Sequence, residues 1–372
     1  MSAGSPRTAA FPACPGASPR HVCGVLVLLG GLLGMFPGAA QAQQPAPTLP
    51  AINLPLSLWT VIAQARGFLA EAYAPLGTRT IRLVDPGSSQ LGGTEAALLD
   101  RGGLALAQRM MYPAAVHKAN GIDARVVWLS GPSTSYRTPV LARTDSPVRT
   151  VADLRGQALG ANRISCGWTS PTEILSAAGV PLDIGERRGA VRFTNISSTV
   201  ANTSALLSGR IEAISTHIAL PDAAGVYLSG QVKVIGRSPE DGIYVNAAGR
   251  VAYFAMRDFA ERYPEAIVAF LRARERTIAW VAQNPDAAAA IVARETRVPV
   301  AVARFELTDP SAFEFIDGEP SADAARGAIK AFQAWYIAQG DDILGRRPLS
   351  DDVIEGFVDG RFFRGGSHSV YQ

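Results

Sequence analysis

The sequence predicts an α/β fold with two lobes of mixed strands and helices, two crossovers between them, and a helical cover at the C-terminus. Two observations carry this prediction. From Ala51 onward, short apolar runs alternate with helical patterns, an order typical of mostly parallel sheets. The same order of elements then recurs at an offset of 108 to 110 residues, which indicates two related lobes.

The expected elements of the first lobe follow one another closely. A loop signal, Asp85-Pro86-Gly87, ends the second strand. Strands are expected at residues 52–56, 80–84, 104–107 and 125–129, and helices at 59–69, 95–100 and 113–120.

Three pairs of short, similar segments indicate the recurrence, and they occur in the same order in both lobes. Each pair alone is weak, but their common offset favours a duplication. The pairs are Trp59-Thr60 in a loop after a strand with Trp168-Thr169, Thr80–Leu83 with Ala190–Phe193, and Ala97–Leu99 with Ala205–Leu207.

The C-terminal third is predicted to be mostly helical. Apolar residues at helical spacing favour a helix over 266–283, and Asn284-Pro285-Asp286 ends it. Further helices are expected at 287–295, 321–339 and 350–358.

Composition excludes several classes of protein. The 372 residues are 48% hydrophobic and 18% charged, which is typical of a globular chain rather than a disordered one. A net charge of +3, with no interleaving of arginine and aromatic residues, argues against a nucleic-acid partner. Three cysteines are too few for a disulfide scaffold.

The N-terminus has the pattern of a secretory signal peptide, assigned to residues 1–42. Arg7 and Arg20 precede an apolar run, Val22–Phe36, and Ala40-Gln41-Ala42 supplies a cleavage site. A membrane anchor is the alternative, but this run is shorter than the roughly 20 residues that span a bilayer. Cleavage would leave 330 residues with a net charge of +1, beginning with a linker at 43–50.

No motif for metal, cofactor or nucleophile chemistry is found. HExxH, CxxC, GxSxG and glycine-rich phosphate patterns are missing from the sequence. Cys166 with His217 as a base is conceivable, and a buried or tolerated cysteine is the alternative. The Asp341-Asp342 and Asp351-Asp352 pairs are interpreted as helix-start and solvating residues. We therefore expect a binding protein without a cofactor, a metal or catalytic residues.

In open α/β sheets, ligands bind at the carboxyl ends of strands, on loops and helix starts. The recurrence points to matching positions in both lobes. The candidate ligand-binding residues are Ser57, Trp59, Thr60, Ser88, Gln108 and Arg109 in the first lobe and Trp168, Thr169, Ser170, Ser197, Thr216 and His217 in the second.

Each candidate also has a structural interpretation. Thr169 or Ser170 before Pro171 predicts a helix N-cap, which either binds an anion or only caps the helix. Arg109 is suited to clamping a carboxylate or sulfonate, and a surface ion pair is its alternative. His217 could equally be a packed histidine. Turn chemistry could account for Ser88 and Ser197.

Several motifs together resemble type II periplasmic solute-binding proteins of ABC importers, in the aliphatic-sulfonate, taurine and nitrate branch that is related to thiamine-precursor-binding domains. The ordered set covers about residues 51–340. The motifs are Val148–Gly160, Ala205–Ala213, Asp258–Glu265 and Trp280–Ala288.

The resemblance implies an exported, periplasmic and monomeric protein that is not an enzyme. It would capture a small anionic solute by hinge closure and deliver it to ABC permease subunits. The implied boundaries are 51–139 and 245–372 for the first lobe and 140–244 for the second, with crossovers near Pro139–Arg143 and Gly242–Val245. An enzyme on the same fold (thiamine-pyrimidine synthase-like or desulfinase-like) or a sensing subunit are the alternatives. The bulky Arg109–Tyr112 segment departs from the usual small polar loop and would suit a larger or partly apolar ligand.

Overall fold

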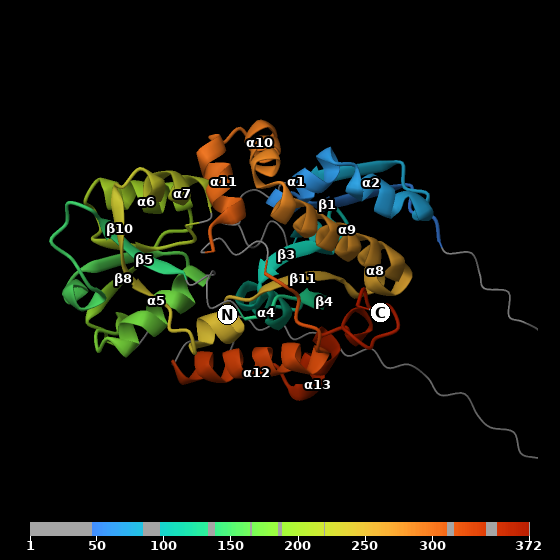
Figure 1. Cartoon of the computed structure of the whole chain (residues 1–372). Coiled ribbons are helices and arrows are strands. Elements are labelled where there is room, and N and C mark those ends of the chain that lie inside the picture. Colours follow the sequence, from blue (N-terminus) through green and yellow to red (C-terminus); the bar gives the residue numbers. More distant parts are fainter. Residues whose placement is uncertain are drawn as a thin grey trace, which may run out of the picture. The chain divides into compact units, whose positions relative to one another are not determined.

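The computed structural model describes residues 47–84, 97–132, 138–163, 166–184, 188–218, 220–310, 316–339 and 348–371. The predicted signal peptide, Ser88 and the Asp341-Asp342 pair lie outside this set. Residues from Ala46 onward form one compact unit, drawn in Figure 1. Among the described residues, no helix is long and apolar enough to cross a membrane.

Strands from two distant parts of the chain build the first lobe. The strands β1 (Ala51–Pro55) and β2 (Thr80–Val84) pair in parallel. The strand β11 (Val251–Met256) runs antiparallel between β3 (Ala107–Met110) and β4 (Ala124–Leu129). The Ala105 N–H donates to the Asn53 carbonyl at 2.9 Å and so links the two groups. The two-stranded sheet β2-β1 thus lies beside the three-stranded sheet β3-β11-β4, in the spatial order β2-β1-β3-β11-β4.

The second lobe contains one six-stranded sheet in the order β10-β5-β9-β6-β8-β7. The strand β6 pairs in parallel with β8 and β9, whereas β5 is antiparallel to β9 and β10. Its strands are β5 (Pro139–Arg143), β6 (Ala158–Ala161), β7 (Leu182–Asp183), β8 (Val191–Asn195), β9 (Ala213–Ser215) and β10 (Val232–Arg237).

The two sheets follow one plan, as the recurrence in the sequence suggests. The order β8-β6-β9-β5-β10 repeats β2-β1-β3-β11-β4, and the antiparallel strand takes the fourth place in each. Trp59 and Trp168 lie in the first turns of α1 (Leu58–Ala65) and α5 (Cys166–Ala177), the helices that follow β1 and β6. Trp59 thus starts the expected helix 59–69, whereas the loop assigned to the two tryptophans in the recurrence is wrong, because each helix begins within a few residues of its strand.

The chain passes between the sheets twice, after β4 and after β10. The first passage, expected near Pro139–Arg143, lies between β4 and β5, and Pro139–Arg143 themselves pair with β9 and β10 as strand β5. The segment Gly242–Val245 does lie between β10 and β11, where a π-helical turn, η3 (Tyr244–Ala248), forms. The lobe boundaries stay a prediction, and the partition of the strands supports them.

The helices agree with the expected pattern in most places. Gly67, in the left-handed conformation at φ 76°, divides the expected helix 59–69 in two. The hydroxyls of Ser321 and Ser350 cap the N-termini of the last two helices, α12 and α13. The α-helices not yet given are α2 (Phe68–Tyr73), α4 (Met111–Ala119), α6 (Thr199–Leu207), α7 (Pro221–Leu228), α8 (Arg257–Arg262), α9 (Pro264–Gln283), α10 (Pro285–Thr296), α11 (Val300–Thr308), α12 (Ala322–Ala338) and α13 (Asp351–Phe357).

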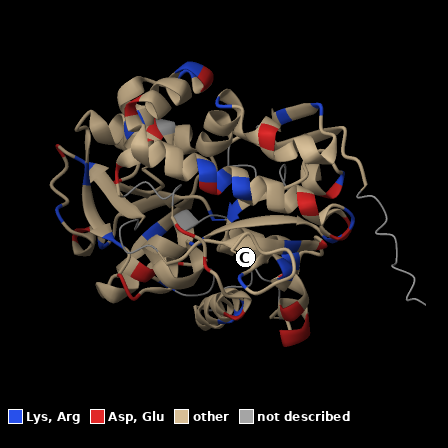
Figure 2. Cartoon of the chain, turned by 45° about the vertical axis from the view of Figure 1, so that its right-hand side comes forward, with Lys and Arg blue, Asp and Glu red and all other residues tan. Residues whose placement is uncertain are grey.

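Three of these helices, α7, α8 and α11, were not expected from the sequence. Short 3₁₀ turns complete the secondary structure, and Asp351-Asp352 forms the first turn of α13 as predicted. The 3₁₀ turns are η1 (Ala74–Leu76), η2 (Val151–Leu154) and η4 (Gly360–Phe362). On the face shown in Figure 2, basic and acidic residues are interspersed over the helices rather than gathered by sign.

Substitution of Gly160 tests the packing of α6 on the second sheet. A Cβ at this position would clash with the Asn202 side chain and lie 2.6 Å from the Ile211 Cδ1 atom. We expect Gly160→Ala to lower the free energy of unfolding by about 1–3 kcal/mol, because the core is overpacked. Urea unfolding measures it.

Gly225→Ala is the matched control, because no heavy atom lies within 4 Å of a Cβ built there on α7. It should leave stability unchanged or raise it by about 0.5–1 kcal/mol. Equal losses in the two variants would contradict the packing described.

Candidate functional site

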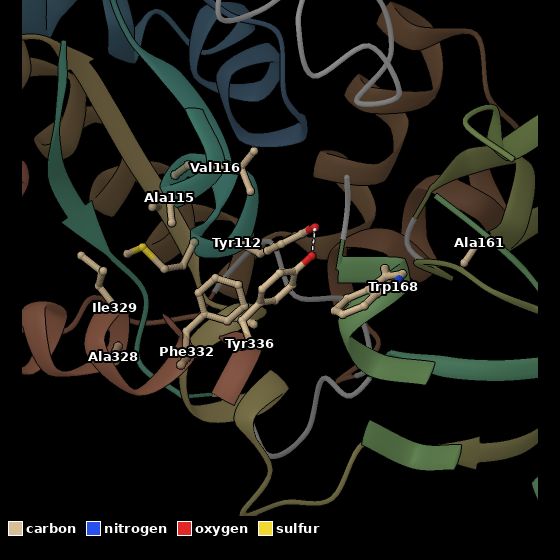
Figure 3. Packing of buried hydrophobic residues seen from close by; sticks show 14 of the residues in the cluster. Tyr112, Ala115, Val116, Ala161, Trp168, Ala328, Ile329, Phe332 and Tyr336 are labelled. Carbon is tan, nitrogen blue, oxygen red and sulfur yellow. Dashed lines mark hydrogen bonds between the residues drawn. The ribbon is translucent and has the colours of Figure 1, made fainter. Parts of the chain in front are cut away.

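Three fully buried aromatic side chains join the two lobes to the C-terminal helices. We call Tyr112 on α4, Trp168 on α5 and Tyr336 on α12 the aromatic bridge (Figure 3). The Tyr112 and Trp168 rings stack with centroids 6.4 Å apart, and the Trp168 and Tyr336 centroids are 4.9 Å apart. The Tyr112 hydroxyl donates to the Arg163 carbonyl at 2.8 Å. The bridge therefore brings the carboxyl end of β3, which leads into α4, beside the carboxyl end of β6.

At the end of β3, Gln108 and Arg109 precede this helix. Arg109 pairs with Ala252 of β11 through the backbone, and only 8% of its surface is exposed. Burial, together with the nearby Arg109 charge, lowers the pKa of His117 on α4 to about 4. At pH 7 the guanidinium is therefore accompanied by a neutral imidazole, and the positive charge remains with Arg109.

At the equivalent end of β9 lie Ser215, Thr216 and His217. Ser215 and Thr216 are buried. Burial lowers the pKa of His217 to about 3, so that its ring is neutral at pH 7. This part of the second lobe therefore offers neutral hydrogen-bonding groups rather than charges.

The helix α5 starts earlier than the sequence suggested. Its first residue is Cys166, and Pro171 lies inside the helix. The predicted N-cap at Thr169 or Ser170 is wrong, because both residues are already helical and fully buried. Pro171 is the sixth residue of α5, where it removes the N–H that would bond to the Gly167 carbonyl and its ring crowds that carbonyl. Trp168 and Thr169 thus project from the first turn of α5.

Five buried polar side-chain atoms in this region have no hydrogen-bond partner among the described protein atoms. Leaving such a group unsatisfied costs about 1–3 kcal/mol. They lie on helices and a strand that pack together, because α5 and α6 both contact β9. The atoms are Trp168 Nε1, Thr169 Oγ1, Asn202 Oδ1, Thr203 Oγ1 and Ser215 Oγ.

The sequence reasoning missed Thr203 and its neighbour Asn202. Both are buried on α6, and the Asn202 amide donates to the Gly160 carbonyl at 3.4 Å. The signal was present, because Thr199, Asn202 and Thr203 follow a capping serine at helical spacing and place three polar groups on one face.

Ser170 and Glu173 connect α5 to both crossovers instead of facing a ligand. The Ser170 hydroxyl donates to the Thr138 carbonyl at 2.9 Å and lies 2.8 Å from the Ser238 hydroxyl. The Glu173 carboxylate accepts from the Ile243 N–H at 2.6 Å. Burial raises the pKa of Glu173, although this backbone hydrogen bond opposes the shift. These hydrogen bonds give Ser170 a structural role, and its role as a ligand contact stays a prediction.

The remaining candidates of the first lobe serve the local structure. Ser57 caps α1, and the Thr60 hydroxyl donates to the Pro55 carbonyl at 2.8 Å. Trp59 is fully buried, and its indole N–H donates to the Tyr253 hydroxyl at 3.0 Å. Trp59 therefore packs in the core of the first lobe. In the second lobe, Ser197 is exposed.

Among the described residues, no group of three or more histidine, cysteine, aspartate or glutamate side chains could hold a metal ion. Cys166 is the first residue of α5, and its side chain lies outside the described part of the chain. The pairing of Cys166 with His217 therefore stays an untested alternative.

Comparison with known proteins agrees with this architecture. Residues 106–288 match the family model described as NMT1/THI5 like. The matched segment runs from the start of β3, through the whole second sheet, to the start of α10, and so contains the predicted binding positions of the second lobe together with Arg109.

The chain is also similar to a sulfonate-binding protein. The chain is 24% identical over 293 residues to an Escherichia coli (strain K12) protein named as an aliphatic sulfonates-binding protein, covering 72% of this chain and 81% of that one.

Two solved structures share the fold. The alkanesulfonate-binding protein SsuA from Xanthomonas axonopodis pv. citri, bound to MOPS, has a TM-score of 0.67 and 18% identity, over 84% of this chain and 99% of that chain. The periplasmic aliphatic sulphonate-binding protein SsuA from Escherichia coli has the same TM-score and 19% identity, over 84% and 92%. The fold is that of the periplasmic binding proteins.

The buried histidines His117 and His217 predict a loss of stability in acid. An unfolded histidine has a pKa near 6.5. Below this pH, His117 and His217 take up protons in the unfolded chain but stay neutral in the folded chain, where their pKa values are lowered. Between pH 7 and pH 5 each should lower the free energy of unfolding by about 2 kcal/mol. Urea unfolding at both pH values measures the loss.

His217→Gln should remove about half of this histidine contribution. His368→Gln is the control, because that residue lies outside the matched segment 106–288. Its Nδ1 atom is 3.3 Å from the Glu265 Oε1 atom. The same pH dependence in wild type and His217→Gln would contradict a buried neutral ring at position 217.

Proposed function

We propose that the protein is the exported solute-binding component of an ABC importer and that it captures a small organic anion, of the sulfonate class, between its lobes. The buried polar atoms at the carboxyl ends of the second sheet carry this proposal. Trp168 and Thr169 come from the first turn of α5, and Ser215 from the end of the adjacent β9. A ligand with several acceptor oxygens would satisfy these groups together.

The charge of the site favours an anion held largely by neutral donors. Arg109 supplies one buried cation, while His117 and His217 are neutral at pH 7. A sulfonate keeps its negative charge at all physiological pH values and presents three oxygens. It can therefore accept from an indole N–H, hydroxyls and a guanidinium at the same time. The sulfonate-binding relatives support this choice of ligand class.

Hinge closure follows from contacts on both lobes. A ligand that touches the β3 end and the α5 start stabilises the arrangement in which both are close, and so shifts the population toward it. A membrane permease that binds this closed arrangement would then receive the solute.

Ligand binding is tested by titration calorimetry and thermal shift on the mature chain. The panel contains alkanesulfonates of increasing length, taurine, MOPS, nitrate, sulfate and matched carboxylates. We expect a sulfonate to raise the melting temperature, because it binds only the folded protein.

Thr169→Val, which keeps the shape and removes the hydroxyl, should weaken the best sulfonate about 10-fold. Thr144→Val is the control, since this exposed threonine bonds the Gly230 carbonyl on the protein surface. Binding that is unchanged in Thr169→Val would remove α5 from the site, and a panel without any shift would overturn the sulfonate proposal.

Export is tested by expressing the full chain in a Gram-negative host and fractionating the cells. We expect the protein in the periplasmic fraction with Gln43 as its first residue, because residues 1–42 carry the signal pattern. N-terminal sequencing identifies the cleavage point. Recovery from the cytoplasm with Met1 intact would contradict export.

A further inference from the structure

The two crossovers meet at the side chain of Tyr244, the first residue of the turn η3. This side chain is fully buried. The Thr138 hydroxyl donates to the Tyr244 hydroxyl, which donates in turn to the Met110 sulfur, a weak acceptor at 3.9 Å. Thr138 directly precedes β5 of the second sheet, and Met110 ends β3 of the first. One hydroxyl group therefore contacts both lobes.

The same contacts lead to both halves of the candidate site. Met110 follows Arg109 at the carboxyl end of β3. On the other side, the Thr138 carbonyl accepts from the Ser170 hydroxyl at 2.9 Å, and Ser170 belongs to α5, whose first turn carries donors of the second lobe. Two hydrogen bonds therefore connect Tyr244 to α5, and one contact connects it to the strand end that carries Arg109.

The backbone around Tyr244 leaves its ring little freedom. The Glu173 carboxylate accepts from the N–H groups of Ile243 and Tyr244, at 2.6 and 3.3 Å. A Cβ at Gly249 would lie 2.6 Å from the Tyr244 ring, so the ring packs directly on the backbone there. The turn also contacts α4, α5 and α12, the three helices of the aromatic bridge. The position of the hydroxyl therefore follows the position of the turn.

A second contact joins the crossovers at their other ends, but it stays within the first lobe. The Arg250 Nε–H donates to the Ser130 carbonyl at 2.6 Å, and these residues border β11 and β4, which are neighbours in the first sheet. A small pocket nearby is lined by both crossovers, including Gly131 and Val245. Because close-packed interiors resist movement, this unfilled space leaves room for the crossovers to change conformation.

We infer that Tyr244 is a positioning residue whose hydroxyl holds the lobes at the spacing in which the carboxyl end of β3 lies beside that of β6. A change in the angle between the lobes moves Thr138 relative to Met110 and so breaks at least one of the two hydroxyl contacts. The hydroxyl therefore favours this arrangement over more open ones. The inference rests on the proposed function for the identity of the site, and it adds a residue that controls the geometry of that site.

Pulsed electron paramagnetic resonance on the mature chain measures the distance between the lobes without any solute. Spin labels are attached at Ser204→Cys on α6 and Ala282→Cys on α9, two exposed positions, and Cys166→Ala removes the one cysteine after residue 42. Tyr244→Phe keeps the ring and removes the hydroxyl. We expect it to raise the fraction of molecules outside the wild-type distance peak about 3- to 10-fold, because a hydrogen bond between the lobes is lost.

Tyr73→Phe is the matched control, because this tyrosine is also fully buried and donates its hydroxyl to the Ala266 carbonyl at 2.8 Å, within the first lobe. It should leave the distance distribution unchanged, and a melting curve of each variant shows that it folds. Thr138→Val removes the partner hydroxyl and should broaden the distribution as Tyr244→Phe does. Combining these two substitutions should add little, because both remove the same hydrogen bond.

A solute separates this inference from the sulfonate proposal. Saturating MOPS or ethanesulfonate should return Tyr244→Phe to the wild-type distance peak, with a calorimetric dissociation constant about 3- to 10-fold above that of the wild type. A distribution that Tyr244→Phe leaves unchanged, or that Tyr73→Phe broadens equally, would overturn the inference whether or not a sulfonate binds. Broadening in Tyr244→Phe but not in Tyr73→Phe, without sulfonate binding by any variant, would support the inference while the sulfonate proposal fails. Broadening with an unchanged sulfonate affinity would overturn the link between Tyr244 and the site.

Discussion

The rest of the molecule depends on the position of one helix, α5. Its first turn places Trp168 in the aromatic bridge, with Tyr112 from the first lobe and Tyr336 from α12. One turn later, Ser170 and Glu173 bond the backbone of both crossovers. A shift of α5 relative to the first lobe therefore has to alter the ring stacking and the crossover contacts together. Such linked contacts favour a few discrete arrangements over gradual deformation.

This arrangement explains why buried polar groups gather where they do. A hydroxyl or indole N–H left unsatisfied in the interior costs free energy, and a fold retains few of them. Unsatisfied polar atoms of Trp168, Thr169 and Ser215 lie together at the carboxyl ends of the strands of one sheet. The same contacts that fix α5 thus hold the donors in place, so less conformational entropy is lost when a ligand binds.

Sequence reasoning succeeded where a local pattern has one structural outcome. Alternating apolar runs located most strands, Ser321 and Ser350 marked helix starts, and the recurrence anticipated two sheets of the same order. It failed where the outcome depends on distant partners. A proline usually marks the first helical turn, but Pro171 lies inside α5. Trp59 and Trp168 look alike in sequence, yet only Trp59 has its indole N–H bonded within the described protein, to Tyr253.

The sequence by itself therefore determined the fold class, the duplication and the set of polar residues at strand ends, because these follow from the chain's periodicity and turn residues. Only the tertiary structure decided which of those residues pack and which face a site. It also revealed the helix α11, whose buried apolar residues lie in two different clusters. The physical reason is that a side chain's role depends on whether a neighbour from elsewhere in the chain satisfies its polar atoms, and that neighbour is selected by folding.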